Sequence, residues 1–340
     1  HIEIIDAIGV TAQKEYAIEK MLNSMQDAWK DINLELLPYE GTFKLAGIDE
    51  TMELLDEHRT LTQQCLFSPY KAFFEERIAL WDHRLSVVSE VIEEWLGVQR
   101  SWLHLQPIFD SPDIKKQLPQ EASRFETVDK NWRDTCKKAY KNPRVIEFCA
   151  AEKLREAFKE SNKFLAIVQK GLSDYLETKR TVFSRFYFLA DEDLLQILSD
   201  SKNPKMVQPH LGTCFEAIKK VTFLDDMKIT TIISREKEKI DLVEVIDPIG
   251  ANVEDWMKLL ELGMIQSVKD QMWKSILSYT QISRVEWMQT WPGMCVINAS
   301  MMHWVREMEA AMKESGADGV KLNYEGQLQQ LENMVDLVRD

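Results

Sequence analysis

The chain has 340 residues, 45% of them hydrophobic, and a formal net charge of −14. This length allows two or more packed units, and the negative charge repels phosphate backbones and anionic membrane surfaces, so we expect no nucleic-acid or membrane partner. No stretch approaches the roughly 18 uninterrupted apolar residues of a membrane span, and no secretory signal opens the chain. With only 12 glycines and 10 prolines, the sequence offers few turns and disfavours an all-β fold.

The first two predicted helices cover residues 11–32 and 49–64. An irregular segment containing Pro38, Gly41 and Gly47 separates them.

Ser68 and Pro69 form a strong helix start, and the helix that follows is predicted to run to about Leu103. Its apolar residues alternate spacings of four and three for three heptads, as in a coiled coil. Three prolines then bracket a short connector: Pro107, Pro112 and Pro119. A further helix is expected to stop near Pro143.

A second long helix is predicted from about Arg144 to Phe183, followed by shorter helices after Asp191 and over 206–221. The pattern then changes to short runs rich in β-branched residues: 221–224, 229–233 and 240–246. These runs predict a small antiparallel β element.

Helical patterns return after the β element. Asn252 is a candidate cap of the next helix, and Ser283 with Glu286 forms a possible capping box. Pro292 opens a helix that Gly316 is suited to end, and helical spacing continues almost to Asp340. Both ends of the chain look cut from something larger.

The fold class that follows is mainly α, an elongated rod of packed helical bundles with one small antiparallel β element. We expect an N-terminal helical subdomain over 1–145 and a middle helical subdomain over 146–220. The β element and a C-terminal helical subdomain would occupy 221–340.

Motifs for catalysis are missing from the sequence. There is no G-x-x-x-x-G-K-[ST] phosphate loop, dinucleotide fingerprint or metalloprotease motif, and the six histidines lack metal-ligand spacing. The five cysteines are scattered without a C-x-x-C pair, which suits reduced thiols in a cytosolic compartment. We therefore expect a chain without enzymatic activity, cofactor or metal.

The aromatic and arginine run at Arg185, Phe186, Tyr187 and Phe188 is the first candidate site. Stacking or a cation–π contact with a ligand is one interpretation. The favoured one is a structural junction between helices, with Arg185 paired to Asp191 or to the acidic residue after it.

A basic stretch stands out against the acidic background and is the second candidate: Arg133, Lys137, Lys138 and Lys141. These residues lie near one helical face. They predict either a contact with an acidic partner surface or, as the favoured alternative, an ordinary solvated face.

Three segments carry a resemblance to a known family. Residues 176–215 read LETKRTVFSRFYFLADEDLLQILSDSKNPKMVQPHLGTCF, and long ordered matches also cover 11–29 and 102–132. Together they resemble the linker region of dynein heavy chains, and the VDKNW run is more similar to axonemal than to cytoplasmic chains. Lys237 departs from the pattern, because it stands where the family has glycine, and leaves the geometry of that turn open.

The resemblance implies a mechanical lever that bends and straightens across a ring of ATPase modules. Its expected partners are the ring and the tail of the same heavy chain, with the microtubule contacted only indirectly. The implied location is the cytoplasm, in the cytoskeleton of a ciliary or flagellar axoneme. The β-containing interruption over 221–252 is the hinge candidate, and the alternative function is a non-motor helical scaffold or tether that binds other proteins.

Overall fold

Helices dominate the computed structural model, which describes residues 2–151, 153–199 and 203–339, with side chains to residue 335. The predicted mainly α class is confirmed. The backbone divides into two compact units, His1–Asp174 and Tyr175–Asp340, each described by itself below. The division into three subdomains remains a prediction; its boundaries fall at the start of α6 and inside strand β3.

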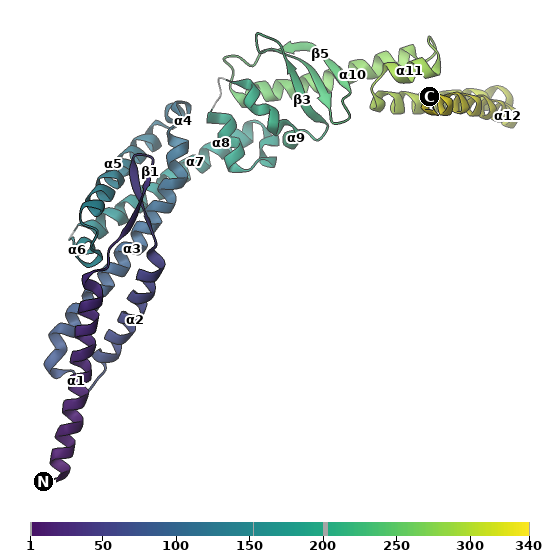
Figure 1. Cartoon of the computed structure of the whole chain (residues 1–340). Helices are drawn as coiled ribbons and strands as arrows, with labels where there is room; N and C mark the ends of the chain where they lie inside the picture. The colour runs from purple at the N-terminus through teal and green to yellow at the C-terminus, as the bar shows by residue number, and fades with distance from the viewer. Residues whose placement is uncertain (1, 152, 200–202, 340) are drawn as a thin grey trace. The chain divides into compact units, whose positions relative to one another are not determined.

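The first unit is built mainly from helices (Figure 1). Its elements are α1 (Ile2–Lys30), β1 (Glu35–Tyr39), β2 (Thr42–Ala46), α2 (Ile48–Leu66), a 3-10 turn (Ala72–Phe74), α3 (Glu75–Phe109), α4 (Pro112–Gln117), α5 (Pro119–Lys141), α6 (Val145–Cys149) and most of α7 (Leu154–Val182).

The apolar stripe of α3 forms the centre of this unit. Trp95 and Trp102 are both fully buried, and both contact Trp132 of α5 at ring-centroid distances of 6.4 and 5.5 Å. Phe158 of α7 stacks on Trp95 at 5.3 Å. The heptad pattern therefore predicts the core correctly, because these large aromatic side chains bury the most apolar surface.

Several predicted boundaries in this unit are wrong. α3 begins at Glu75 rather than Pro69, and it continues through Pro107 to Phe109. A proline this close to the helix end removes only one backbone hydrogen bond. The helix expected from Arg144 to Phe183 is two helices, because α6 ends at Cys149 and α7 begins at Leu154.

The segment expected to be irregular contains a second β element, the antiparallel hairpin β1–β2. Glu40 and Gly41 at its turn both have positive φ, 41° and 75°, as a two-residue hairpin turn requires. The side-chain amide of Gln99 donates to the Leu45 carbonyl oxygen (2.9 Å) and accepts from its amide nitrogen (2.7 Å). The polar Gln99 thus stands in the apolar seam of α3 and binds the backbone of the hairpin.

The second unit continues from the end of α7. Its elements are a 3-10 helix (Ser184–Phe188), α8 (Asp191–Ser199), a 3-10 helix (Pro204–His210), α9 (Leu211–Cys214), β3 (Ile218–Phe223), β4 (Ile229–Ser234), β5 (Lys239–Ile246), α10 (Val253–Ser278), α11 (Arg284–Thr290) and α12 (Gly293–Arg339). The helix expected over 206–221 is therefore wrong: Pro209 and Gly212 disfavour it, and residues from 218 onward form a strand.

The predicted β element is confirmed as an antiparallel sheet in the order β3-β4-β5. Lys237, in the turn between β4 and β5, has a φ of 71°, so a residue with a side chain occupies a conformation that favours glycine. The sheet packs against α10 (Figure 1), where the Ser267 hydroxyl accepts a hydrogen bond from the Val243 amide at 3.0 Å.

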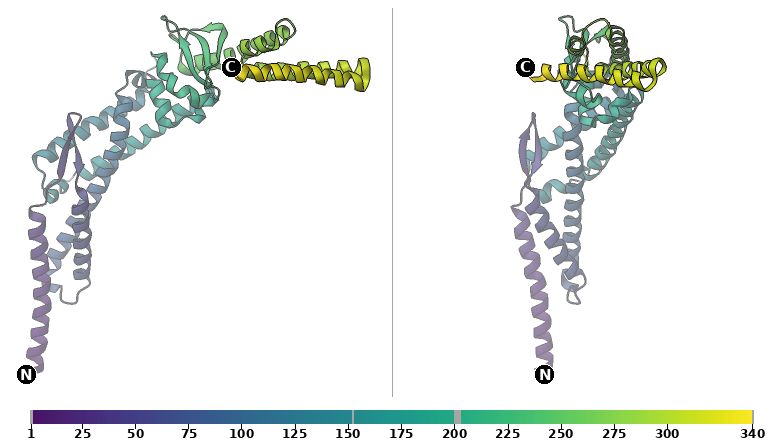
Figure 2. Two further views of the ribbon diagram at one scale, coloured as in Figure 1. Left: turned by 45° about the vertical axis from the view of Figure 1, so that its right-hand side comes forward. Right: turned by 90° about the vertical axis from the view of Figure 1, so that its right-hand side faces the viewer.

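The ends of the C-terminal helices follow the sequence signals. The Ser283 side chain accepts a hydrogen bond from the Glu286 amide at the start of α11, as the capping box predicts. Gly316 leaves helical geometry with φ 58° and ψ −136°. The chain folds back there (Figure 2), and the Gln327 amide donates to the Glu307 carboxylate at 2.6 Å. In one straight helix, Glu307 and Gln327 would lie about 30 Å apart, so their hydrogen bond requires the chain to fold back.

Candidate functional site

The aromatic and arginine run lies where α7 gives way to a 3-10 helix in the second unit. Phe186 is fully buried and meets Phe183 edge to face at a centroid distance of 4.9 Å. Phe215, just after α9, is tilted against Phe183 at 6.2 Å. These three side chains hold the end of α7 against the segment that follows it.

Arg185 contacts three different groups around this aromatic cluster. Its Nε donates to the Glu261 carboxylate of α10 at 2.9 Å, and its Nη1 donates to the Cys214 carbonyl oxygen at 3.1 Å. The guanidinium carbon lies 4.8 Å from the centre of the Phe215 ring. The expected pairing of Arg185 with Asp191 or its neighbour is therefore wrong, because the arginine reaches a helix 76 positions further along the chain.

Arg180 takes the place that the sequence suggested for Arg185. Its guanidinium donates to Asp191 at 2.6 Å and to the Leu189 carbonyl oxygen at 3.1 Å. Asp191 opens α8, where a carboxylate also interacts favourably with the helix dipole. Arg180 thus fixes the angle at which the chain leaves α7.

Lys179 and Glu254 form the most enclosed ion pair, with side chains 13% and 6% exposed. Glu254 lies in the first turn of α10, so the pair joins the last turn of α7 to the beginning of another helix. The second carboxylate oxygen of Glu254 is buried, with no hydrogen-bond partner in the part of the chain that the structure describes. Neither residue was a candidate site from the sequence. The signals that could have indicated them are a basic residue in the last turn of α7 and an acidic residue in the first turn of α10.

The other two aromatic side chains of the run are exposed. Phe188 is 65% exposed and Tyr187 is 55% exposed. The Tyr187 hydroxyl binds the Glu177 carboxylate, which raises the pKa of the tyrosine. The run is therefore divided: Arg185 and Phe186 form the junction, and Tyr187 and Phe188 lie on its surface.

Cys214 is the cysteine at this junction, where its carbonyl oxygen accepts from Arg185. Burial raises the pKa of Cys214 to about 11, although Arg185 opposes the shift, so the thiol is a poor nucleophile. Across residues 2–151, 153–199 and 203–339, no three metal-binding side chains gather in one place. The ion pairs and the aromatic cluster hold the end of α7, the segment after α9 and α10 together.

The basic candidates on α5 fall into two groups. Arg133 serves the interior of the first unit: it pairs with Asp129 at 2.9 Å, lies over Trp102 and donates to the Glu40 carbonyl oxygen. The other three are exposed, and within the described residues none has a carboxylate within 4 Å: Lys137, Lys138 and Lys141. Of the four candidates, these three present positive charge that no described carboxylate neutralises.

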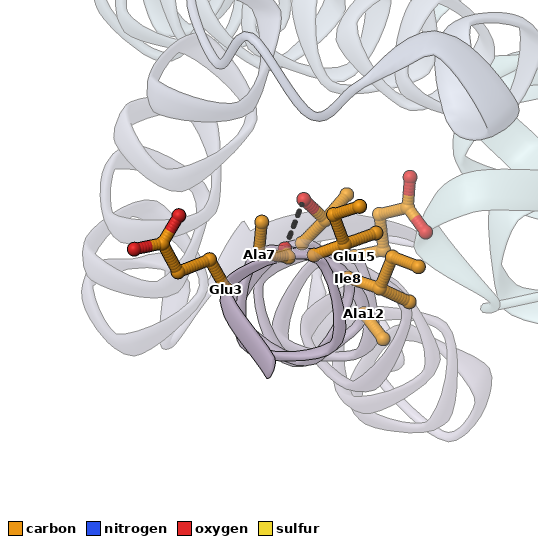
Figure 3. Close-up of a pocket in the computed structure, with 7 residues that line it drawn as sticks. Glu3, Ala7, Ile8, Ala12 and Glu15 are labelled. Atoms are coloured by element: carbon orange, nitrogen blue, oxygen red, sulfur yellow. Dashed lines mark hydrogen bonds between the residues drawn. The ribbon is translucent and has the colours of Figure 1, made fainter. Parts of the chain in front are cut away.

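A shallow hollow near the start of the chain is bounded by one helix alone (Figure 3). Glu3, Ala7, Ile8 and Glu15 all come from α1, and the drawn hydrogen bond runs from the Thr11 hydroxyl to the Ala7 carbonyl oxygen. Because its lining within the described part of the chain comes from α1 alone, the hollow offers no enclosed ligand site.

Among the described residues, no helix is long and apolar enough to cross a membrane.

Comparisons with known proteins identify the family of the chain. The family model described as "Dynein heavy chain, N-terminal region 2" matches residues 1–275. The chain is 44% identical over its whole length to human "Dynein axonemal heavy chain 1", of which it covers 8%. It is 38% identical over its whole length to rat "Dynein axonemal heavy chain 12", covering 11% of that protein, and 37% identical over 92% of its length to human "Dynein axonemal heavy chain 3", covering 8%.

The chain belongs to the dynein heavy chain family and contains its N-terminal region 2. It spans about a tenth or less of the length of these relatives. The family membership predicted from the sequence is therefore confirmed at this level.

Proposed function

We propose that this chain is the linker of an axonemal dynein heavy chain. It would act as a lever that bends and straightens across the ATPase ring and would have no catalytic site of its own. The names of the axonemal relatives support the location, the axoneme of a cilium or flagellum. The partners in this proposal are the ring and the tail of the same heavy chain, and the microtubule is reached only through them.

One observation carries the mechanical part of the proposal. The end of α7 is attached to α10 by the ion pair of Lys179 with Glu254, and the 3-10 helix that follows α7 is attached to α10 by the ion pair of Arg185 with Glu261. A force along α7 is therefore carried into α10 and the sheet beside it without passing through a flexible loop. Stiffness of this kind is what a lever needs between its ends.

The candidate hinge over 221–252 remains a proposal, and the sheet in that segment packs on α10. The exposed lysines Lys137, Lys138 and Lys141 remain a proposed contact for an acidic partner surface. The lysine contact is not required for the lever itself.

Labels at Glu19 and Glu325, introduced as fluorescent unnatural amino acids in the intact heavy chain, test the lever. Both positions are exposed. Energy transfer between them is expected to differ between the nucleotide-free and ATP-bound motor. Equal transfer in all nucleotide states would show that the linker does not change shape.

Charge swapping tests the junction in the same motor. Arg185→Glu or Glu261→Arg alone is expected to slow microtubule gliding, and the double variant to recover part of the speed, because the ion pair returns in reverse but the contact with Phe215 does not. The surface pair Asp270 and Lys274 of α10, swapped in the same way, is the control and is expected to leave the speed unchanged. Single variants at the junction that glide normally would show that it does not carry force.

A further inference from the structure

A groove in the first unit has no role in the lever proposal. It lies between the end of α1, the first half of α3 and the beginning of α6, and has a volume of about 450 Å³. This volume suits a few side chains of a bound ligand. Unlike the hollow on α1, it is walled by three elements.

Positive charge dominates the walls of this groove. Four cations face it, Lys30, Arg77, Arg84 and Arg144, against only two carboxylates. The balance is the reverse of that in the whole chain, where 56 acidic residues outnumber 42 basic ones. A concave surface of one charge concentrates ligands of the other.

Two of these cations are already engaged. Arg144 pairs with Glu147 at 2.9 Å, and Arg77 donates to the Asn23 side chain at 3.0 Å. Within the described residues, Lys30 and Arg84 have no carboxylate within 4 Å, and both are exposed. They are the two cations in the groove that remain open to a ligand.

The floor of the groove combines these charges with apolar surface. Trp81 is buried, and the guanidinium carbon of Arg84 lies 5.7 Å from the centre of its ring, which restrains the arginine. Leu80 is 47% exposed beside it. Arg77, Leu80, Trp81 and Arg84 follow helical spacing along one face of α3, so cation, apolar surface and cation alternate over about 10 Å.

We propose that this groove binds an acidic polypeptide segment. Its carboxylates would pair with Arg84 and Lys30, and an apolar side chain between them would cover Leu80. A phosphate group would need the cations to converge on one point, whereas here Arg77 and Arg84 lie two turns apart on α3 and Lys30 comes from α1. An extended acidic segment matches that distribution, with carboxylates repeated every few residues.

Binding of a labelled peptide to the 340-residue chain tests the proposal. The probe is a fluorescein-labelled Glu-Glu-Leu-Glu-Glu-Leu-Glu-Glu peptide followed by anisotropy at low ionic strength, and the same peptide with Gln in place of Glu is the neutral comparison. Lys30→Glu with Arg84→Glu removes two attractions and adds repulsion, so we expect binding to weaken about tenfold or more. Lys30→Gln with Arg84→Gln is expected to lie between this variant and the wild type.

Lys163→Glu with Lys170→Glu is the matched control. Both lysines are exposed on α7 and outside the groove, and the pair changes the net charge of the chain by the same amount. The control is expected to bind within about twofold of the wild type, because remote exposed charges are screened. The circular dichroism of all variants should be the same, since every altered side chain is exposed.

Four results would overturn the proposal. The wild-type chain could fail to bind the glutamate peptide, it could bind the neutral peptide as tightly, or the control could lose as much affinity as the groove variant. The fourth is displacement of the peptide by inorganic phosphate at a lower concentration than by free glutamate peptide, which would assign the groove to a phosphoryl group. None of these outcomes bears on the lever, which is tested by energy transfer.

Discussion

Lys179 and Glu254 join the last turn of α7 to the first turn of α10 through an ion pair that solvent scarcely reaches. Removing one member of such a pair leaves the other charge buried and alone, which costs more than the pair itself contributes.

Lys179→Met is therefore expected to destabilise the second unit by about 3 kcal/mol, and Lys179→Met with Glu254→Leu by clearly less, because the double variant leaves no buried charge. Hydrogen exchange of the amides in the first turns of α10 measures this change locally. A double variant that exchanges faster than the single variant would contradict the explanation.

His58 gives the first unit a predicted dependence on pH. Its Nδ1 accepts a hydrogen bond from the Trp29 indole at 2.8 Å, and burial lowers its pKa below 6.5, against a smaller opposing effect of Glu57. The folded state therefore favours the neutral ring, so this contribution to stability is complete above pH 6.5 and is lost as the pH falls toward the folded pKa.

The expected observation is a urea midpoint that falls between about pH 7 and pH 5. His58→Phe should reduce this dependence, because no proton binds at that position, although it lowers the stability at neutral pH by leaving the indole unpaired. His83 is exposed on α3, and its replacement by Ala is the control that should retain the dependence. If the urea midpoint of the His58→Phe variant depends on pH as strongly as that of the wild type, another group causes the dependence.

Lys237 occupies the turn between β4 and β5 with a φ of 71°. A non-glycine residue in this region is strained by about 1 kcal/mol, whereas glycine adopts it freely. Lys237→Gly is thus expected to raise the thermal midpoint of the second unit in calorimetry. Lys239→Gly, inside β5, should lower it, and a decrease in both variants would argue against strain in the turn.

Gln99 binds both backbone groups of Leu45. Gln99→Leu would continue the apolar seam of α3 but leave a backbone donor and acceptor of β2 without partners, so we expect a loss of about 2 kcal/mol. Gln99→Glu keeps the side-chain oxygen that accepts from the Leu45 amide, so it is expected to lose less stability at neutral pH. Urea denaturation distinguishes the two, and a Leu variant as stable as the wild type would show that water replaces the amide.

The sequence patterns correctly predicted the structural features that depend on residues close together in the chain. The stripe of α3 indicated its burial, the three β-branched runs indicated the sheet, and Gly316 indicated the end of a helix. The junction could not be predicted in the same way, because Arg185 is only six positions from Asp191 but pairs with Glu261, 76 positions away. Likewise, the role of Gln99 depends on Leu45, which lies 54 positions earlier and which the pattern of α3 does not indicate.

The residue at position 316 determines whether α12 folds back on itself or continues as one straight helix. A side chain would find open space there, so the restriction is conformational: φ 58° with ψ −136° is accessible to glycine and closed to other L-residues. With alanine at this position, the 47 residues of α12 would be driven toward one straight helix of about 70 Å instead of two antiparallel arms. The direction of the second arm of α12 is therefore set by the absence of a single carbon atom.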